Sequence, residues 1–433
     1  LFESWEKAQG RLAKQAPAWI RQLVLAADQF VVERSPGGEE ALRGTPNALA
    51  EHYSRFDVAH RLLLTGHSHQ AWPDVAREAQ LEAWDDAARD VDDKWARAFA
   101  QADLVRAGFA RLLGCAPKEV ALAASTHELV VRFLSALPLS ARPRLVTTDG
   151  EFHTLRRQLD RLAEARVVEV VKLAVEPVDT LAERLAASVD GRTAAVLVSS
   201  VLFGSARIVP GLALVAQACE RVGAQLLVDS YHHVGVVPFD LVGEGLQNAF
   251  VTGGGYKYCQ LGEGNCFLRV PPACTLLPIV TGWFSEFAKL ASRPEGAVPF
   301  GEGAARWAGA TYDPVSHYRG ARVFRFFEER GLTPDLLRAV SQHQMGRLAV
   351  RFDALALDPA VVTRDRSAPL TALAGFLALR SPRAGELSRR LHERGVWTDF
   401  RGDVLRLGPA PYNADAQLDA AMAVLGEVTA SGG

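Results

Sequence analysis

The sequence predicts an α/β fold, with a large domain built on a mainly parallel sheet and a smaller α+β domain after it. From about residue 100 to 270, short apolar runs rich in β-branched residues alternate with helical stretches, the pattern of buried parallel strands joined by helices. From about residue 300 the helices become longer and enclose only a few short strands. The length of 433 residues agrees with two domains, because a single hydrophobic core seldom serves so long a chain.

The expected elements alternate regularly along the chain. The runs expected to form strands of the large sheet are Arg144–Thr148, Val167–Leu173, Ala194–Ser199, Gln225–Asp229, Ala249–Thr252 and Cys266–Val270. The helices expected between them are Leu155–Ala165, Val178–Ser188 and Leu212–Val222. The smaller domain is expected to contain helices Tyr318–Glu329, Pro334–Phe352 and Ala384–Arg394 and the strand Val404–Leu407.

These patterns divide the chain into three parts. An N-terminal helical segment and linker is expected at residues 1–60, the large domain at 61–300 and the small domain at 301–433. Within the first part, apolar residues at helical spacing predict one or two amphipathic helices up to about residue 34. The run from Ser35 to Gly38, rich in proline and glycine, is expected to be a linker.

Charge and composition point to a small-molecule substrate. The formal net charge is −2, so nothing suggests an electrostatic grip on nucleic acid or on an anionic membrane. No run of about 18 apolar residues occurs, so no membrane-spanning helix is expected. The five cysteines are scattered without CxxC spacing, which favours a reducing cytoplasm over a disulfide framework or a zinc knuckle.

Two pairs of histidines could suggest a metal site, His67 with His69 and His232 with His233. Neither pair has the i, i+4 spacing of a helical zinc motif, and no nearby glutamate completes one. No bound metal is therefore expected.

The main chemical signal is an aspartate and a lysine that follow consecutive strands. Asp229 ends one strand, and the carboxyl ends of buried parallel strands face the crevice where such sheets bind ligands. Lys257 follows the next strand, after three glycines and between Tyr256 and Tyr258. Pyridoxal 5′-phosphate (PLP) needs a lysine amine that forms a Schiff base and an acid that keeps the pyridine nitrogen protonated. An apolar setting also lowers the pKa of a lysine amine and so favours its nucleophilic attack.

Each of these features alone has another interpretation. A strand-end aspartate often caps a helix or turn, and a lysine beside tyrosines often lies at the surface with its stem on a ring. The glycines could form only a tight turn, since no GxGxxG motif is present. Asp229, His232 and Lys257 at this spacing after two strands together favour PLP chemistry.

This combination resembles the class V, fold-type-I PLP enzymes, and within them it is most similar to the kynureninases. That branch carries a histidine shortly after the pyridine-binding aspartate and a tyrosine directly before the lysine, here His232 and Tyr256. The resemblance implies the PLP-transferase fold of type I, with a seven-stranded sheet, in a homodimer with shared active sites. It also implies that Lys257, Asp229 and Tyr256 are catalytic, that His232 orients the cofactor ring and that Tyr256 binds its phosphate.

A second stretch, Asp399–Asn413, resembles the kynureninase C-terminal strand, whose arginine holds the substrate α-carboxylate. On that resemblance Arg406 is the carboxylate clamp, which suits the fork of a guanidinium group. A turn at Thr65–Ser68 resembles one that lines the substrate pocket, so His67 and Ser68 are expected beside the substrate. The remaining residues expected to bind the cofactor are Ser125 and Thr126 at a helix start, Phe152 as the stacking ring, Trp283, and Thr311 supplied by the neighbouring subunit.

The chain departs from the kynureninases on the substrate and phosphate sides. Leu155, Phe284 and His67 stand where that family carries an acid, a tryptophan and an asparagine. No cysteine follows Cys274, which disfavours persulfide-type sulfur transfer. The activity that the resemblance implies is hydrolysis of kynurenine or 3-hydroxykynurenine to an anthranilate and alanine. Two alternatives stay open: another class V PLP enzyme (a lyase, epimerase, decarboxylase or aminotransferase) acting on a different α-amino acid, and a non-catalytic α/β protein.

Overall fold

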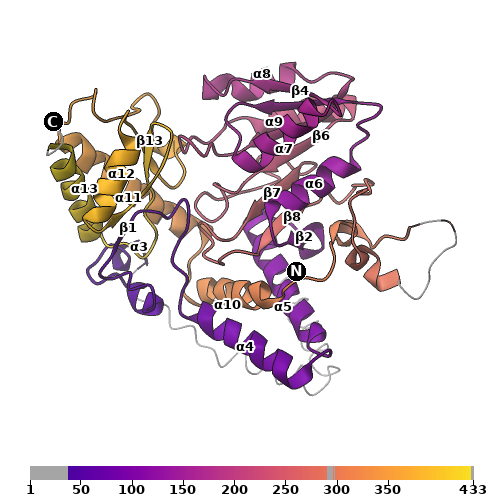
Figure 1. The fold of residues 1–433 in the computed structure, drawn as a ribbon, viewed down its shortest axis with the longest axis horizontal. Helices are drawn as coiled ribbons and strands as arrows, with labels where there is room; N and C mark the ends of the chain where they lie inside the picture. The colour runs from indigo at the N-terminus through magenta and orange to yellow at the C-terminus, as the bar shows by residue number, and fades with distance from the viewer. Residues whose placement is uncertain (1–37, 290–295, 297, 431–433) are drawn as a thin grey trace, which may run out of the picture.

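The computed structural model describes residues 38–289, 296 and 298–430. The amphipathic helices expected up to residue 34, and most of the expected linker, lie outside these residues. Figure 1 shows two groups of elements: a sheet with helices on both sides, and a helix-rich group that contains α11, α12, α13 and β13. This arrangement agrees with a sheet-centred part followed by an α+β part, while the expected boundary at residue 300 stays a prediction.

The large sheet has seven strands in the order β2-β8-β7-β6-β5-β3-β4. The neighbours from β7 through β6, β5 and β3 to β4 pair in parallel, whereas β8 runs antiparallel to both β7 and β2. The expectation of a mainly parallel sheet is therefore confirmed. The strands are β2 (Val120–Ala123), β3 (Arg144–Thr148), β4 (Glu169–Leu173), β5 (Thr193–Ser199), β6 (Gln225–Asp229), β7 (Phe250–Gly254) and β8 (Cys266–Arg269).

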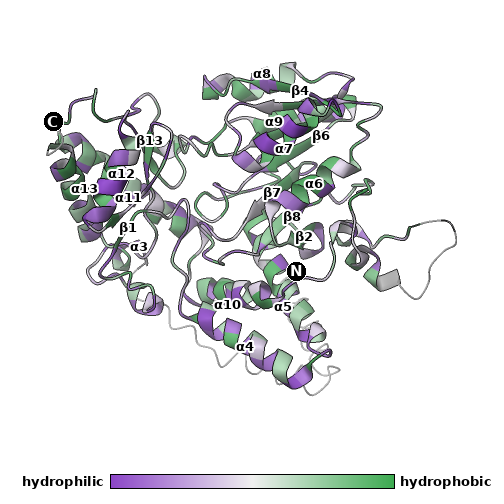
Figure 2. Ribbon diagram, viewed as in Figure 1, coloured by the Kyte–Doolittle hydropathy of each residue, from purple (hydrophilic) through white to green (hydrophobic). Residues whose placement is uncertain are grey.

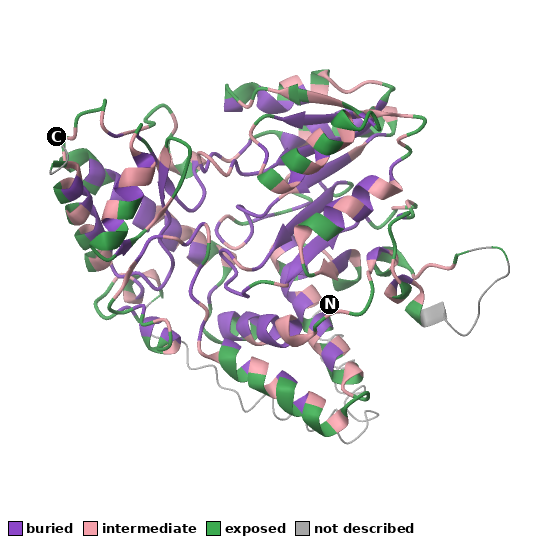
Figure 3. Ribbon diagram, viewed as in Figure 1, coloured by how far each residue is buried: buried purple, intermediate pink, exposed green. Residues whose placement is uncertain are grey.

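Both faces of this sheet are covered, which explains why its strands read as continuous apolar runs. Every residue of β5 is buried, and alternate side chains enter different cores. Ala195 and Leu197 pack with α6 and α7, whereas Val196 and Val198 pack with α5, α8 and α9. Figures 2 and 3 show the apolar, buried strands enclosed by helices whose outer faces are polar and exposed.

The helices expected at Leu155–Ala165 and Leu212–Val222 are present beside the sheet. The helix expected in the small domain at Tyr318–Glu329 instead packs with this part of the chain. The stretch expected as one helix from Val178 is divided into a 3-10 turn, η3 (Val178–Thr180), and the helix α8. The helix α10 packs against both α4 and α5. The helices of this part are α4 (Val75–Asp90), α5 (Trp95–Leu113), α6 (Thr126–Ala136), α7 (His153–Glu164), α8 (Leu181–Ala187), α9 (Leu212–Val222) and α10 (Val315–Glu329).

The C-terminal group has its own sheet and its own core. Its four strands lie in the antiparallel order β12-β13-β10-β9. A separate parallel pair joins β1 to β11, so a segment near residue 62 lies beside the C-terminal part. The elements are β1 (Leu62–Leu63), β9 (Thr363–Arg364), β10 (Leu377–Arg380), β11 (Val396–Trp397), β12 (Asp399–Arg401), β13 (Val404–Leu407), α3 (Gly38–Ala41), α11 (Pro334–Ala354), α12 (Ala384–Glu393) and α13 (Asp415–Ala430).

None of the helices in the described part of the chain is both long enough and apolar enough to cross a membrane. The five cysteines all lie in that part, and their thiols are free. The cytoplasmic location stays a prediction.

Candidate active site

A cavity of about 230 Å³ opens at the carboxyl edge of the large sheet. The strands β5 and β6 end there at Ser199 and Asp229, which lie side by side in the parallel register. This is the edge at which α/β sheets bind ligands. The cavity is lined by Ala124, Ser125, Thr126, Phe152, Thr154, Ser199, Val201, Phe203, Asp229, Tyr231, His232, Tyr256, Lys257, Glu263, Gly264 and Cys266.

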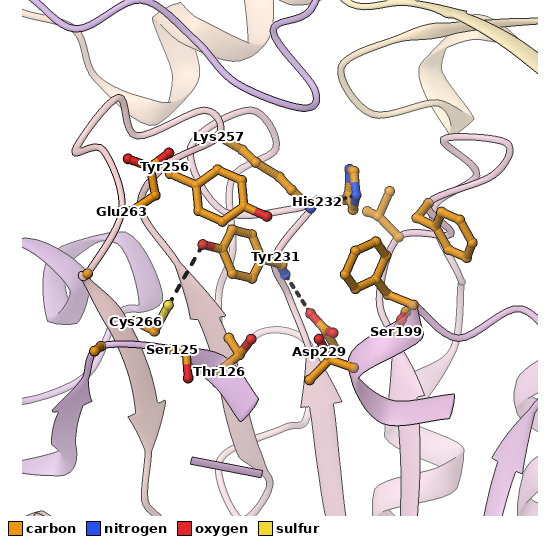
Figure 4. A pocket seen from close by; sticks show the side chains of 16 residues that line it. Ser125, Thr126, Ser199, Asp229, Tyr231, His232, Tyr256, Lys257, Glu263 and Cys266 are labelled. Carbon is orange, nitrogen blue, oxygen red and sulfur yellow. Dashed lines mark hydrogen bonds between the residues drawn. The ribbon is translucent and has the colours of Figure 1, made fainter. Parts of the chain in front are cut away.

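Lys257 lies in the loop after β7 and is 5% exposed. Its Nζ is 2.7 Å from Nε2 of His232 and 4.5 Å from the ring centre of Tyr231. Figure 4 shows the lysine side chain extending to His232, with the rings of Tyr231 and Tyr256 beside it. A glycine is required at the end of β7, because a Cβ at Gly254 would lie 2.4 Å from the hydroxyl of Tyr231. The glycine at the end of β7 thus leaves room for the ring of Tyr231 to pack beside the amine of Lys257.

The surroundings of Lys257 favour its neutral amine. Burial lowers the pKa of Lys257 to about 7, and the positive charge of Arg406 acts in the same direction against the attraction of Asp229. Burial, together with the charge of Lys257, also holds the pKa of His232 well below its usual value. At neutral pH the cavity therefore contains a neutral imidazole and a lysine of which a large fraction is unprotonated. Such a lysine is a competent nucleophile and proton acceptor.

Asp229 lies at the same end of the cavity as Ser199 (Figure 4). Its Oδ1 accepts a hydrogen bond from the backbone N–H of Tyr231 at 2.9 Å. Its second carboxylate oxygen makes no hydrogen bond to any side chain or backbone group that the structure describes. Burial raises the pKa of Asp229, although the Tyr231 amide and the charge of Lys257 oppose that effect. The carboxylate can therefore receive a positively charged N–H from a molecule in the cavity.

A buried carboxylic acid supports the loop that carries Phe152. Glu151 accepts hydrogen bonds of 2.6 Å from the hydroxyls of both Thr148 and Ser199. Burial raises the pKa of Glu151 to about 7. These bonds tie the end of β3 to the end of β5, and Phe152 follows directly, with its ring centre 5.3 Å from Nζ of Lys257. The aromatic ring expected to stack on a cofactor is thus brought to the cavity.

The predicted phosphate end is divided between two neighbouring cavities. Ser125 and Thr126 begin α6 at the wall of the first one, and the hydroxyl of Ser125 caps that helix by accepting from the backbone N–H of Glu128. The free amides of a helix N-terminus suit a phosphate. Trp283 and Thr311 are joined to each other by a hydrogen bond of 3.2 Å from the indole N–H, and neither lines this cavity. Thr311 instead lines the adjacent cavity of about 850 Å³, which shares Ala124, Glu263 and Gly264 with the first.

On the predicted substrate side, Arg406 is buried. It forms an ion pair with Asp399, and its Nη1 donates to the backbone carbonyl of Phe203, which lines the cavity. His67 is fully buried and bonds to Asp399 as well. The hydroxyl of Ser68 hydrogen-bonds the neighbouring His69 at 3.2 Å, and Ser68 does not line the cavity.

Several residues of the site were not singled out in the sequence, namely Glu151, Ser199, Phe203, Tyr231 and Asp399. The strand-end rule that identified Asp229 applies equally to Ser199, which ends the preceding parallel strand. Glu151 likewise follows the end of β3. Tyr231 follows the end of β6 in the same way. Asp399 depends on a hairpin and Phe203 on a contact between segments far apart in the chain, so strand-end position does not identify these two.

The residues present fit PLP. Nδ1 of His232 is buried and has no hydrogen-bond partner within the described part of the chain. Among the described residues, the Asp229 carboxylate accepts a hydrogen bond only at Oδ1, from the backbone of Tyr231. The buried Lys257, the carboxylate of Asp229, the ring of Phe152 and the N-terminus of α6 all lie at the same cavity. No three His, Cys, Asp or Glu side chains gather in a metal-binding arrangement among residues 38–289, 296 and 298–430. The absence of a bound metal stays a prediction.

No protein-family model matches the chain. The chain is 23% identical over 332 residues to an uncharacterized aminotransferase, YcbU, of Bacillus subtilis, covering 75% of this chain and 83% of that protein. It is 26% identical over 344 residues to the isopenicillin N epimerase of Streptomyces clavuligerus, covering 72% of this chain and 81% of the epimerase.

Solved structures establish the fold. A C-DES mutant with glycine covalently linked to the PLP cofactor superposes with a TM-score of 0.75 at 16% identity, over 87% of this chain and 98% of that one. An apo cysteine desulfurase from Thermococcus onnurineus gives a TM-score of 0.73 at 15% identity, over 90% and 99%. The chain therefore has the α/β PLP-transferase fold of type I, as the sequence predicted.

Proposed function

We propose that this protein is a PLP-dependent enzyme that removes the α-proton of an amino acid. The observation that carries the proposal is the pairing, across one cavity, of the buried Lys257 with Asp229. Both relatives found by sequence, an aminotransferase and an epimerase, bear names of reactions on amino acids, and they support this cofactor and this substrate class.

When bound, PLP supplies an aldehyde that links covalently to amines and a ring that accepts electrons from the substrate. The amine of Lys257 would hold the cofactor, and once a substrate amine has displaced it, the free amine would accept the proton from the substrate α-carbon. Asp229 would supply the negative charge that keeps a proton on the ring nitrogen. Phe152 would pack against the cofactor ring, and Arg406 would position the substrate carboxylate, which decides the bond that reacts.

The kynureninase reaction is the second candidate. The two relatives favour another class V PLP enzyme over a kynureninase. What favours the kynureninase reaction is the placement of His232, Tyr256 and the Arg406 strand in the pattern that resembles the kynureninases. In this chain no cysteine follows Cys274, so a persulfide-type desulfurase is not proposed.

Hydrogen exchange at the α-carbon tests the proposed function without knowledge of the substrate. PLP-loaded protein is incubated in D₂O with a panel of L-amino acids that includes kynurenine, and the α-proton signal is followed by NMR. Loss of that signal for at least one amino acid is expected. Release of anthranilate and alanine from kynurenine would favour the second candidate, and no exchange with any amino acid would contradict α-proton removal.

PLP uptake by the cofactor-free protein should depend on pH with a midpoint near 7. Because only the unprotonated amine attacks the aldehyde, the rate should rise about tenfold per pH unit below the midpoint and level off above it. Burial of the amine is the main cause of this low midpoint, and the charges of Asp229 and Arg406 act on it in opposite directions. The control is lysine acetylated at its α-nitrogen, whose free side-chain amine should react with PLP with a midpoint near its ordinary pKa of about 10.5. A midpoint near 10.5 in the protein would contradict a desolvated Lys257.

Replacing Arg406 by alanine should raise KM for an amino-acid substrate by about 10- to 100-fold, since a charge-assisted pair is worth roughly 1.5–3 kcal/mol. The matched control is Arg380→Ala, which removes an exposed arginine from β10, the other strand paired with β13, and should leave KM unchanged. An unchanged KM in Arg406→Ala, measured by steady-state kinetics, would mean that another residue binds the carboxylate.

The predicted homodimer with shared active sites belongs to the same proposal. The exposed Trp283 and Phe287 lie in an aromatic cluster with Phe284, near Thr311. Apolar side chains exposed together support a surface that a second copy of the chain covers, and across that surface each copy would bring its Thr311 to the cavity of the other.

A cytoplasmic location is proposed from the five free thiols.

A further inference from the structure

A buried chain of three polar side chains lies behind the substrate side of the cavity. It consists of Arg406 on β13, Asp399 on β12 and His67 in the turn after β1. In the antiparallel register of this hairpin, Asp399 lies directly opposite Arg406. Asp399 has no part in the proposed function as described so far.

The ion pair uses only one edge of the guanidinium group. Nε of Arg406 donates to Oδ1 of Asp399 at 2.9 Å, and Nη2 donates to Oδ2 of the same carboxylate. Nη1 donates to the carbonyl of Phe203 at 2.8 Å. A guanidinium group has five N–H bonds, and these contacts use three of them. The remaining two N–H bonds are one on Nη1 and one on Nη2. These two terminal nitrogens form the end edge of the guanidinium group, as distinct from the side edge that Nε and Nη2 form.

Asp399 is itself fixed from the other side. Nε2 of His67 lies 2.7 Å from Oδ1 of Asp399, and the His67 side chain is completely buried. A Cβ at position 408 would lie 2.2 Å from Nδ1 of His67, so Gly408 is what allows the imidazole to sit there. The carboxylate is therefore held in place by a second residue rather than free to swing away.

The pKa values fit a permanent ion pair. Burial lowers the pKa of His67 to about 4, so its ring is neutral at pH 7 and donates one N–H to the carboxylate. Burial alone would raise the pKa of Asp399, but the hydrogen bonds from His67 and Arg406 hold it well below its usual value. At neutral pH the charges of Arg406 and Asp399 balance, and the guanidinium keeps a fixed orientation.

We propose that Asp399 is a positioning residue that holds the side edge of Arg406 so that its end edge receives the carboxylate of an amino-acid substrate. Asp399 and the ligand bind to different edges and do not compete. His67, which stands where the resembled family has an asparagine, acts through Asp399. This inference rests on the proposed function, because it needs an amino acid bound beside PLP.

The test is a comparison of two probes on PLP-loaded protein, L-alanine and ethylamine, which differ by the carboxylate. Binding is followed by the change in the visible absorbance of PLP. In Asp399→Asn, an amide N–H₂ faces Nη2 and cannot accept from it, so the fork loses its alignment. The apparent Kd for L-alanine should rise about tenfold or more, while the Kd for ethylamine stays within about twofold.

Three further variants complete the experiment. Asp403→Asn is the matched control in the same hairpin and should behave as the wild type. The Asp403 side chain is exposed, and its ion pair with Arg380 is a long one of 3.6 Å. Asp399→Glu should recover part of the selectivity for L-alanine, and it gives the same readout if Asp399→Asn does not fold. In an Arg406→Lys background, Asp399→Asn should have no further carboxylate-specific effect, because the fork is already lost.

Equal weakening of both probes would reduce Asp399 to a structural role, and tighter binding of L-alanine would make it a competitor of the ligand. Either result, or unchanged binding, overturns the inference while the PLP proposal stands, provided that the variant takes up PLP as the wild type does. A wild-type protein that takes up no PLP overturns the proposed function, and the inference falls with it.

Discussion

Replacing Lys257 by alanine is expected to reduce α-proton exchange by about 1,000-fold or more, because both the covalent link to PLP and the proton acceptor are lost. The variant should still fold, since alanine removes only one buried amine and its stem. PLP should bind weakly and without the absorbance band that a lysine-linked cofactor gives. Exchange is measured by NMR, and PLP loading by absorbance after gel filtration.

The matched control for this variant is Lys172→Ala on β4. Lys172 is a partly exposed lysine on the same sheet, paired with Asp160, and its loss should change neither exchange nor PLP loading. Full activity of Lys257→Ala would remove this lysine from the chemistry. Loss of activity in both variants would point to a general effect on stability instead.

Replacing Asp229 by asparagine is expected to lower exchange by about 100- to 1,000-fold, the range seen when one preorganised electrostatic group is removed. The substitution is nearly isosteric, and its amide oxygen can still accept from the backbone N–H of Tyr231. What it removes is the negative charge. That charge raises the pKa of Lys257, so the pH midpoint for PLP uptake should also fall below its wild-type value near 7.

Asp149→Asn is the control for this second variant. Asp149 follows the end of β3 at the same edge of the sheet, but it is exposed and bonds the backbone of Val175. Its replacement should leave exchange and the pH midpoint unchanged. If Asp229→Asn exchanges the α-proton as the wild type does, a different group must hold the charge of the cofactor ring.

Burial and strand order explain how much the sequence could predict. The strands β3, β5 and β6 were predicted almost to the residue, because both faces of each are buried and their apolar runs are continuous. The reversed direction of β8 could not be read in the same way, because a fully buried strand has the same pattern whether it runs parallel or antiparallel. Asp229 and Lys257 could be predicted because each directly follows a strand.

The substrate side was harder to predict because it depends on a hairpin. The strand β12 has only three residues, too few for a periodic pattern, and only β13 was expected. The dipeptide Gly402–Asp403 is nevertheless a two-residue hairpin turn signal. Pairing outward from it places Asp399 opposite Arg406, so this ion pair was within reach of the sequence. The contact of Arg406 with Phe203 joins segments far apart in the chain and was not.

The predicted positions of Trp283 and Thr311 stand apart from those of the other cofactor residues. They bond to each other beside the second cavity rather than at Lys257. A shared site would explain this arrangement, because residues that serve a neighbouring subunit need not reach their own cavity.

Peptide mapping after borohydride reduction tests the central claim most directly. Protein loaded with PLP is reduced, digested and analysed by mass spectrometry, which locates any lysine that carries a pyridoxyl phosphate group. The label is expected on Lys257 and on no other lysine. A label on a different lysine, or no label at all, would contradict the account of this site.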